Sequence, residues 1–435
     1  MGHAIQSDRE HRLLQRQLDR TLMGAPDSPA LMQILRLLFT PEEASLARRL
    51  PGKLSTLGRL ARKLQMPRDE LEARLTAMAE RGLVIDLQYA GTRFFTLAPI
   101  VIGFFEFTFM RTRDNLPMAE LARLFDEYMG SSDRFYRSAM GGRTQLGRSL
   151  VREESLPEDD HTEVLDWQRA SHIVQSASPI GVSLCPCRHK ASHLGKACDR
   201  PQRACLSLNY AAESVIRNGM AEEVTVAEAM QILEECKQAG LAQTGDNVQR
   251  KMAYICNCCG CCCEMVRALK TFGIRGAIVT SNWQAEIDTA ACTGCGRCVE
   301  ACPVDAIEVV ELSDHGESRK QAVCDSRLCL GCGVCYSACR FGAIAMKPRA
   351  QRVFTPETVF DRVVAMAIER GKLADLIFED PERFSHRALA RLVGVIERSP
   401  PFRAALAIKP LRSVFLNGLV AVAKSQSRAM RGMFE

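Results

Sequence analysis

The hydrophobic positions of the first hundred residues follow helical spacing and then change to short runs typical of strands. Apolar side chains recur every three to four positions between Leu31 and Leu38, and similar spacing returns in later stretches. Pro41 and Pro67 are placed to begin helices, and Gly82 is placed to end one. The pattern predicts helices over residues 31–38, 42–50, 54–65 and 67–82, and strands over 83–87 and 93–97.

Residues 28–100 resemble a winged-helix domain, because helices are followed by a hairpin. In such a domain the last helix, here residues 67–82, would enter the DNA major groove. This helix carries four acids against three bases, and the hairpin adds only Arg93. The charged residues of the helix are Arg68, Asp69, Glu70, Glu72, Arg74, Glu80 and Arg81. We therefore expect a structural or protein-docking role and no nucleic-acid partner.

Cysteine is the residue type that most changes this picture, because the chain has 20 among its 435 residues. They gather in two short regions, which differs from the disulfide framework of a small secreted domain. The first 25 residues are too charged for the core of a signal peptide, and residues 414–422 are too short to span a bilayer. We expect a cytoplasmic protein with reduced thiols. Its net charge of +6 is mild and does not require nucleic acid.

One cysteine motif occurs twice, with a period of 37 residues. Both copies have the spacing C-x2-C-x2-C-x3-C, in which one tight loop can hold three irons of a [4Fe–4S] cubane. The fourth thiolate must come from elsewhere. Glycines at 294, 296, 331 and 333 let the backbone turn closely around the inorganic sulfides. Two complete motifs in tandem favour iron–sulfur clusters strongly over two zinc sites.

This segment resembles the bacterial ferredoxins that bind two [4Fe–4S] clusters, in which the fourth cysteine of each motif serves the other cluster. The resemblance covers about 60 residues, 285–348. It implies that cluster I is bound by Cys292, Cys295, Cys298 and Cys339. It implies that cluster II is bound by Cys329, Cys332, Cys335 and Cys302. Arg340 stands where the family has a proline, and its charge is expected to raise the potential of the nearby cluster.

A second cysteine field precedes this segment, and six of its cysteines fall within residues 256–263. Its members are Cys185, Cys187, Cys198, Cys205, Cys256, Cys258, Cys259, Cys261, Cys262 and Cys263. Soft thiolates select iron–sulfur clusters or zinc. We expect a subset of the ten to bind a third [4Fe–4S] cluster, with structural zinc and a metal-free thiol relay as alternatives. Cys236 and Cys324 lack partners at metal spacing and are expected to be packing residues.

The complete pattern predicts an α+β multidomain protein. Its expected parts are an N-terminal arm (1–27), the winged-helix-like domain (28–100), a helical connector (101–179), a cysteine-rich region in a mainly helical middle (180–280), the ferredoxin-like α+β module (285–348) and a helical C-terminal region (349–435). The cysteine-rich part also resembles a region that precedes ferredoxin modules in a group of bacterial iron–sulfur proteins. Residues 409–431 are expected to pack on the protein, with a membrane-surface helix as the alternative.

The leading functional hypothesis is an electron-transfer protein that relays single electrons through two or three [4Fe–4S] clusters. It would serve a larger oxidoreductase, and its redox partner would be a flavoprotein or a metalloenzyme, because the chain has no glycine-rich motif for a nicotinamide or flavin. Two alternatives stay open. One is a redox-sensing transcriptional regulator with a winged helix, and the other is a self-contained reductase that uses the cysteines of residues 256–263.

Overall fold

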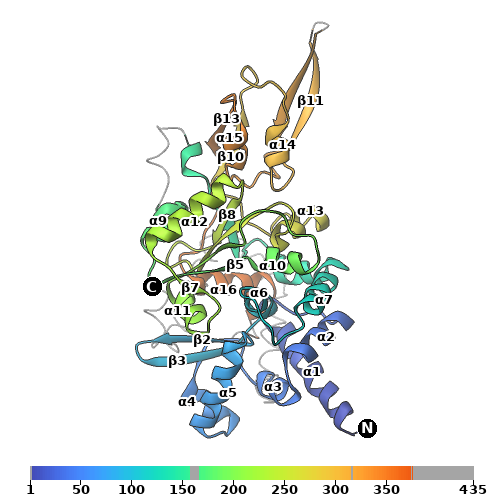
Figure 1. Cartoon of the computed structure of the whole chain (residues 1–435), viewed down its shortest axis with the longest axis vertical. Helices are drawn as coiled ribbons and strands as arrows, with labels where there is room; N and C mark the ends of the chain where they lie inside the picture. The colour runs from blue at the N-terminus through green and yellow to red at the C-terminus, as the bar shows by residue number, and fades with distance from the viewer. Residues whose placement is uncertain (1, 157–165, 315–316, 374, 376–435) are drawn as a thin grey trace, which may run out of the picture. The chain divides into compact units, whose positions relative to one another are not determined.

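The computed structural model describes residues 2–156, 166–314, 317–373 and 375 of the chain, whose elements are labelled in Figure 1. Most of the predicted C-terminal region, including residues 409–431, therefore lies outside the described residues. The chain divides into two compact units. Unit 1 comprises Met1–Thr144, Glu213–Ala221 and Thr358–Glu435, and unit 2 comprises Gln145–Ala212 and Glu222–Glu357.

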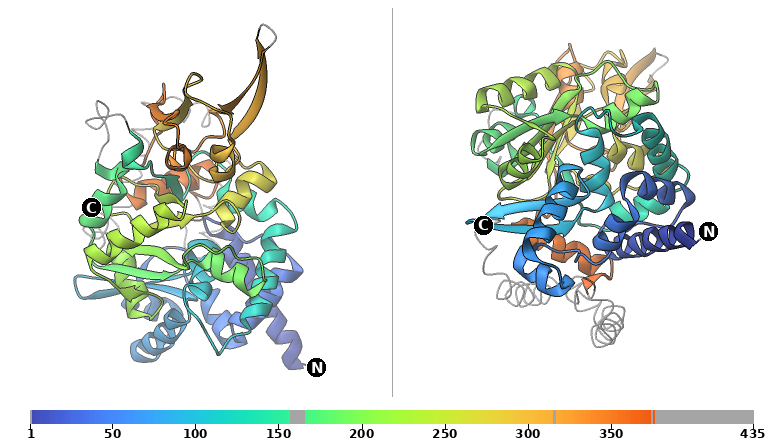
Figure 2. Two further views of the ribbon diagram at one scale, coloured as in Figure 1. Left: turned by 45° about the horizontal axis from the view of Figure 1, so that its top comes forward. Right: turned by 60° about the horizontal axis from the view of Figure 1, so that its bottom comes forward.

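The N-terminal part of unit 1 is a group of packed helices. Helix α1 (Gly2–Arg20) packs on α2 (Pro29–Leu38) and α3 (Pro41–Ala47), which are blue in Figure 2. Thr40 and Glu43 form a capping box that begins α3, as expected for a threonine before a proline and two glutamates. Leu14 and Leu18 of α1 are fully buried. The segment expected to be an N-terminal arm, residues 1–27, therefore contains a helix that contributes to the core.

A small three-stranded sheet follows these helices. Its elements are β1 (Ser55–Thr56), α4 (Leu57–Leu64), α5 (Arg68–Glu80), β2 (Val84–Tyr89) and β3 (Thr92–Leu97), with the strand order β1-β3-β2. The turn between β2 and β3 has Ala90 and Gly91 at positive φ, the conformation that a tight hairpin requires. The helices and the hairpin lie where the sequence predicts them, and their interpretation as a winged helix stays a prediction.

The remaining helices of unit 1 enclose an aromatic core. They are α6 (Phe105–Phe109), α7 (Met118–Gly130), α8 (Arg134–Met140), the end of α11 (Asn209–Arg217) and α16 (Val359–Glu369). Phe105, Phe109 and Phe125 contact one another edge-on or tilted, with ring centroids 5.2 to 5.9 Å apart. The helical connector expected over residues 101–179 is therefore helical between residues 105 and 140, but it also contains the strand Gly147–Ser149.

Unit 2 is built on a six-stranded antiparallel sheet, and this corrects the expectation of a mainly helical middle. The strands are β4 (Gly147–Ser149), β5 (Ile180–Leu184), β6 (Arg203–Leu208), β7 (Glu222–Glu223), β8 (Ala242–Asp246) and β9 (Tyr254–Cys258). Their order is β4-β8-β9-β6-β5-β7. The strands have two to six residues, and cysteine, glycine and serine occupy many of their positions, so they show little of the alternation that identifies a strand.

Four helices accompany this sheet. They are α9 (Ala170–Gln175), α10 (Pro186–His193), α12 (Val226–Gln238) and α13 (Glu264–Phe272). Helix α12 packs on β5 and β6, and α9 packs on α12. Helices α10 and α13 begin where β5 and β9 lead out of the sheet, and the cysteine field lies at these two exits. Cys236 is buried on α12, as expected for a packing residue.

The double cysteine motif forms two short strand pairs and two short helices within unit 2. The elements are β10 (Trp283–Ile287), α14 (Arg297–Ala301), β11 (Ile307–Asp314), β12 (Glu317–Cys324), α15 (Val334–Ala338) and β13 (Ile344–Pro348). Strands β10 and β13 pair antiparallel, and so do β11 and β12. Each motif is thus a loop, one short helix and a strand, as a repeated sequence predicts. Among the described residues, no helix is long and apolar enough to cross a membrane.

Candidate metal centres

The four cysteines expected to bind cluster I line one cavity. These are Cys292, Cys295, Cys298 and Cys339, and apolar residues of β10 and β13 close the cavity at its sides. Cys295 is exposed and Phe341 beside it is 52% exposed, whereas Cys292 and Cys298 are buried. The last cysteine of the second motif therefore meets the first three of the first motif. This cavity lies at the protein surface.

The cysteines expected to bind cluster II gather in the interior of unit 2. Cys329, Cys332 and Cys335 are buried, and Cys302 interacts electrostatically with each of them. Burial raises the pKa of Cys332 to about 12, and the neighbouring thiols add to this shift. The backbone N–H of Arg152 donates to the carbonyl of Cys332 over 3.1 Å, which joins this loop to the segment after β4.

The backbone around both sets fits iron–sulfur clusters. N–H groups of Ala322, Ala306 and Gly331 donate to the sulfurs of Cys292, Cys302 and Cys329 over 3.2 to 3.4 Å. Such hydrogen bonds stabilise the thiolate form and hold the ligand sulfurs of a cluster in position. Gly294 has a φ of +67°, and a Cβ atom there would lie 2.5 Å from the carbonyl oxygen of Lys320. Glycine is therefore required where this loop approaches β12.

Cys324, which the sequence indicates to be a packing thiol, lies against a member of the cluster II set. Its thiol is in hydrogen-bond contact with Cys329 at the point where β12 ends. This hydrogen bond is the main cause that lowers the pKa of Cys329, to about 6. The only signal in the sequence was that Cys324 comes five residues before Cys329. Because β12 ends at Cys324, the chain turns there and brings the two thiols into contact.

Six cysteines of the second field form a connected group, the six-thiol group, on one side of the central sheet. Strand register places Cys205 of β6 directly opposite Cys256 of β9, with their sulfurs 3.7 Å apart. Cys258 follows Cys256 by two residues and therefore lies on the same face of β9. Further thiol contacts join Cys258 to Cys263, Cys263 to Cys187 and Cys187 to Cys185.

Two helix N-termini face the six-thiol group. Cys185 is the N-cap of α10, and Cys263 is the N-cap of α13. The N-terminal end of a helix carries partial positive charge and favours thiolates over neutral thiols. Without a bound metal, mutual contact and burial raise the pKa of Cys185 well above its usual range, with the contact from Cys187 the largest cause. Such a group of thiols is stabilised when a metal replaces their protons.

The other four cysteines of the field form a second group, the four-thiol group: Cys198, Cys259, Cys261 and Cys262. Their sulfurs all lie within 4.8 Å of one another. Cys198 comes from the loop between α10 and β6, and the other three come from the turn between β9 and α13. The structure thus places all ten expected residues close together, but in two groups.

Buried positive charges accompany the cysteine field and were not singled out by the sequence. Arg188 is fully buried and donates to the carbonyls of Pro201 and Asn257 over 2.9 and 3.0 Å. Burial alone would lower the pKa of Arg188. The adjacent thiols, including Cys185 and Cys259, outweigh burial and raise this pKa above its usual value. Arg188 is therefore a fixed cation that contacts Cys259 of the four-thiol group and interacts electrostatically with Cys185 of the six-thiol group. In the sequence, the basic residues that directly follow Cys187 were the available signal for positive charge beside the thiols.

A buried ion pair lies beside Arg188. Lys190 of α10 donates to Glu264 of α13 over 2.6 Å, and both side chains are nearly inaccessible to solvent. The pair joins the two helices whose N-termini face the six-thiol group. His189 and His193 of α10 contact each other with their Nε2 atoms 3.3 Å apart, and neither belongs to the four-thiol group.

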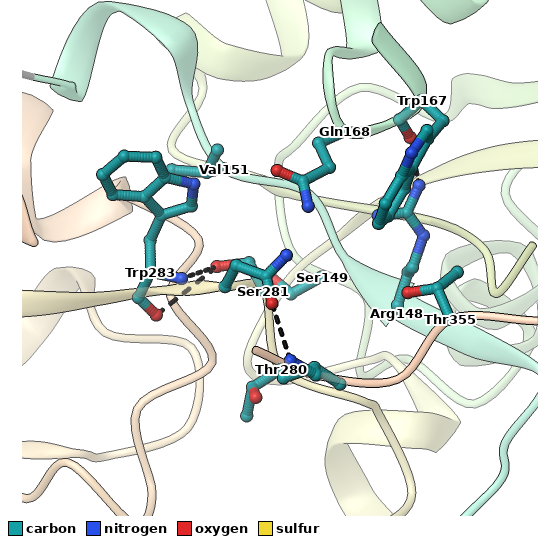
Figure 3. Close-up of a pocket in the computed structure, with 11 residues that line it drawn as sticks. Arg148, Ser149, Val151, Trp167, Gln168, Thr280, Ser281, Trp283 and Thr355 are labelled. Atoms are coloured by element: carbon teal, nitrogen blue, oxygen red, sulfur yellow. Dashed lines mark hydrogen bonds between the residues drawn. The ribbon is translucent and has the colours of Figure 1, made fainter. Parts of the chain in front are cut away.

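A polar pocket elsewhere in unit 2 is too small for an organic cofactor. Arg148, Trp167, Gln168, Ser281 and Trp283 line it, and the Arg148 guanidinium stacks 4.7 Å from the Trp167 ring centroid (Figure 3). Its free volume is about 10 Å³, which is room for about one water molecule. Burial lowers the pKa of Arg148 to about 9. We therefore assign this pocket a structural role.

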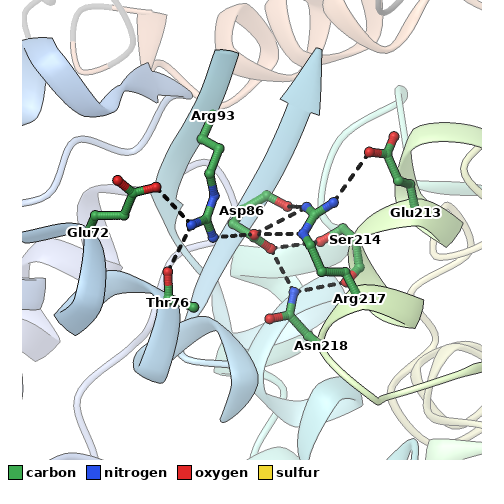
Figure 4. A network of polar contacts seen from close by, with 8 residues as sticks. All are labelled: Glu72, Thr76, Asp86, Arg93, Glu213, Ser214, Arg217 and Asn218. Carbon is green, nitrogen blue, oxygen red and sulfur yellow. Dashed lines mark hydrogen bonds and ion pairs between the residues drawn. The ribbon is translucent and has the colours of Figure 1, made fainter. Parts of the chain in front are cut away.

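In unit 1, three of the four basic residues that a winged helix would turn toward DNA, Arg74, Arg81 and Arg93, form ion pairs. Arg93 of the hairpin donates to Asp86 and to Glu72 over 3.0 Å (Figure 4). Asp86 also accepts from Arg217 and Asn218 at the end of α11. Burial raises the pKa of Asp86, but the hydrogen bonds from Asn218, Arg217 and Arg93 outweigh it and lower the pKa below the usual value.

Helix α5 shows the same neutralisation. Arg74 pairs with Glu70, and Arg81 pairs with Glu43 over 2.5 Å. A side chain already held by a carboxylate must give up that partner to bind a phosphate. These contacts favour the structural or docking role expected for this domain.

The cysteine field and the dicluster segment pack on each other within unit 2. A Cβ atom at Gly260 would lie 2.8 Å from the carbonyl oxygen of Pro303, the residue after Cys302. Ala242 of β8 packs against Val334 and Cys332. Lys270 of α13 also pairs with Asp305 over 2.7 Å. The interior set of dicluster cysteines therefore faces the field.

Comparison with known proteins identifies one part of the chain. Residues 291–353 match the family described as 4Fe-4S dicluster domain. No curated protein and no solved structure matches the chain. The chain therefore carries a 4Fe-4S dicluster domain together with a separate cysteine-rich region. This combination indicates iron–sulfur electron transfer.

Proposed function

We propose that the chain is an electron-transfer component of a larger oxidoreductase. Cluster I would be held by the surface set of dicluster cysteines and cluster II by the interior set, as the ferredoxin resemblance implies. The six-thiol group would hold a third [4Fe–4S] cluster. Each cluster supplies reversible storage of one electron. The observation that carries the proposal is that the interior set of dicluster cysteines packs against the cysteine field.

This packing supports a direction for the relay. The cluster I cavity includes the exposed Cys295 and Phe341, so a partner protein can approach it closely. The cluster II cysteines are enclosed, and their loop contacts Arg152 and Ala242. We infer that the redox partner docks at cluster I and that cluster II faces the third centre.

The partner is expected to be a flavoprotein or another metalloenzyme. The pocket lined by Arg148 and Trp167 has room for about one water molecule and therefore cannot hold a flavin. In this proposal the partner converts two-electron donors into single electrons. A protein with many metal-binding thiols also requires a reducing compartment, and for this reason we place it in the cytoplasm.

Metal and sulfide analysis of the full chain tests this proposal. After anaerobic purification we expect about twelve iron and twelve sulfide per chain, because each of three cubanes contributes four. Reduction should give the magnetic resonance signals of interacting paramagnetic clusters. The matched variants are Cys335→Ser for cluster II and Cys258→Ser for the third centre, and each should lower iron by about four. A protein with zinc and no sulfide would disprove electron transfer by these residues.

A further inference from the structure

Among the described residues, the four-thiol group is the cysteine group in which every sulfur lies close to every other one. Cys261 and Cys262 have sulfurs 3.6 Å apart, and Cys262 and Cys198 have sulfurs 3.9 Å apart. All four sulfurs lie within 4.8 Å of one another. Four thiolates around one zinc ion, at about 2.3 Å from the metal, form a tetrahedron with edges of about 3.8 Å. The observed distances are those of a site for one metal ion.

A [4Fe–4S] cubane requires a wider arrangement, because each of its four thiolates binds a different iron. The interior dicluster set is wider: Cys302 interacts electrostatically with Cys329, Cys332 and Cys335, yet these described sulfurs form no group within 4.8 Å of one another. A disulfide does not explain the four-thiol group either, because its sulfurs are much farther apart than the roughly 2.05 Å of an S–S bond.

The surroundings of the four-thiol group also fit a closed structural site. The backbone N–H of Cys262 donates to the sulfur of Cys259 over 3.3 Å, which stabilises a thiolate and fixes its direction. Arg188 contributes a buried positive charge beside Cys259, which offsets the negative charge of four thiolates. Four protein ligands leave no open position, and this is typical of structural rather than catalytic zinc.

We propose that Cys198, Cys259, Cys261 and Cys262 bind one zinc ion, separate from every iron–sulfur cluster of the chain. The ion would join the loop between α10 and β6 to the turn between β9 and α13. The same turn supplies Cys258 and Cys263 to the six-thiol group. Zinc would therefore hold the turn in the conformation that the neighbouring centre requires.

The test uses the full chain, purified anaerobically with both iron and zinc present in the growth medium. We expect one zinc per chain, and X-ray absorption at the zinc edge should show four sulfur neighbours at about 2.3 Å. The variant C198S/C261S should lose this zinc and keep the dicluster iron. The matched variant C187S/C258S should lose about four iron and keep the zinc. Cys236→Ser, which changes a buried thiol on α12, should alter neither metal.

Three outcomes would overturn the proposal. One is a wild-type protein without zinc, and another is a site that holds iron with four sulfur neighbours. The third is a C198S/C261S variant that retains its zinc. If that variant does not fold, Cys261→His offers an independent check, because imidazole replaces thiolate at zinc and leaves one nitrogen and three sulfurs around the metal. Unchanged sulfur coordination in Cys261→His would also refute the assignment. Because zinc and iron are measured separately, failure here is distinct from failure of the electron-transfer proposal.

Discussion

The dicluster segment and the cysteine field both gather thiols, but they do so by different means. In the dicluster segment, one short loop supplies three cysteines of each set. The fourth cysteine, Cys339 or Cys302, comes from the other motif. In the field, strand pairing places Cys205 opposite Cys256, and Cys185 and Cys263 join the same group as the N-caps of two helices. Local spacing therefore determines the first region, whereas tertiary structure determines the second. The expected consequence is that the field depends more strongly on the folding of unit 2.

The largest effect should follow from removing ligands of the six-thiol group. C187S/C258S should lower iron by about four per chain and leave the magnetic resonance signals of the dicluster segment in place. The reason is that neither residue belongs to the two dicluster sets. Iron and sulfide analysis with spin quantification measures this change. Loss of all iron would show instead that the dicluster segment cannot load without the field.

Arg188 allows a sharper test of what the field requires. Arg188→Met removes a fully buried cation that interacts with both thiol groups, and we expect the field to lose most of its metal. Leaving buried thiolates without a compensating charge should lower the free energy of unfolding by about 3 to 5 kcal/mol. Urea unfolding with metal analysis measures both quantities.

Arg327→Met is the matched control for Arg188, because the Arg327 side chain is 87% exposed and pairs with Asp325 at the surface of the dicluster segment. Its cost should stay below about 1 kcal/mol, with full metal content. Equal effects of the two substitutions would remove the reason for assigning Arg188 a role in the field.

A substitution at Asp86 tests whether unit 1 can be destabilised without a change in the metal content of unit 2, because Asp86 lies in unit 1 and both cysteine regions lie in unit 2. Asp86→Asn removes the buried carboxylate that Arg93 and Arg217 share and should destabilise unit 1 by about 3 kcal/mol at pH 7. Because the pKa of Asp86 is lowered by folding, the wild-type advantage is complete above the unfolded pKa of about 4. It should disappear as pH falls through the folded pKa.

Unfolding of both proteins between pH 7 and pH 3 measures this dependence, and iron content should not change. Glu127→Gln breaks the exposed pair with Arg123 and should cost less than about 1 kcal/mol. A penalty for Asp86→Asn that stays constant over this pH range would contradict the assignment to the ionised carboxylate.

The smallest effect concerns Cys324. Its thiol contacts Cys329, and a hydrogen bond to a cluster ligand stabilises the reduced, more negative state. Cys324→Ala should therefore lower the potential of cluster II by tens of millivolts without loss of iron. Redox titration followed by magnetic resonance measures the shift, and Cys236→Ala serves as the control. An unchanged potential would make Cys324 a packing residue, as the sequence indicated.

The sequence predicts local features of this protein much better than those that depend on strand register. The helices and hairpin of residues 31–97 follow from apolar spacing and from prolines, and the two motif copies follow from their regular cysteines. The sheet of unit 2 was missed, because β9 carries cysteines at 256 and 258 that indicate metal ligation more strongly than they indicate a strand. The division of the ten cysteines into a group of six and a group of four depends on the pairing of β6 with β9, and the spacing of the cysteines along the sequence does not reveal it.

The positions of the cysteines along the chain also determine the order in which the centres can be completed during synthesis. All ten cysteines of the field have left the ribosome once residue 263 has, whereas the cluster I set is complete only with Cys339. These positions are 76 residues apart, which at about 5 to 20 residues per second corresponds to roughly 4 to 15 s of translation. Zinc and iron delivery to the field can thus begin on the nascent chain. A field that has bound its proposed metals would present the loop at Gly260 as a surface on which the later Pro303 segment folds.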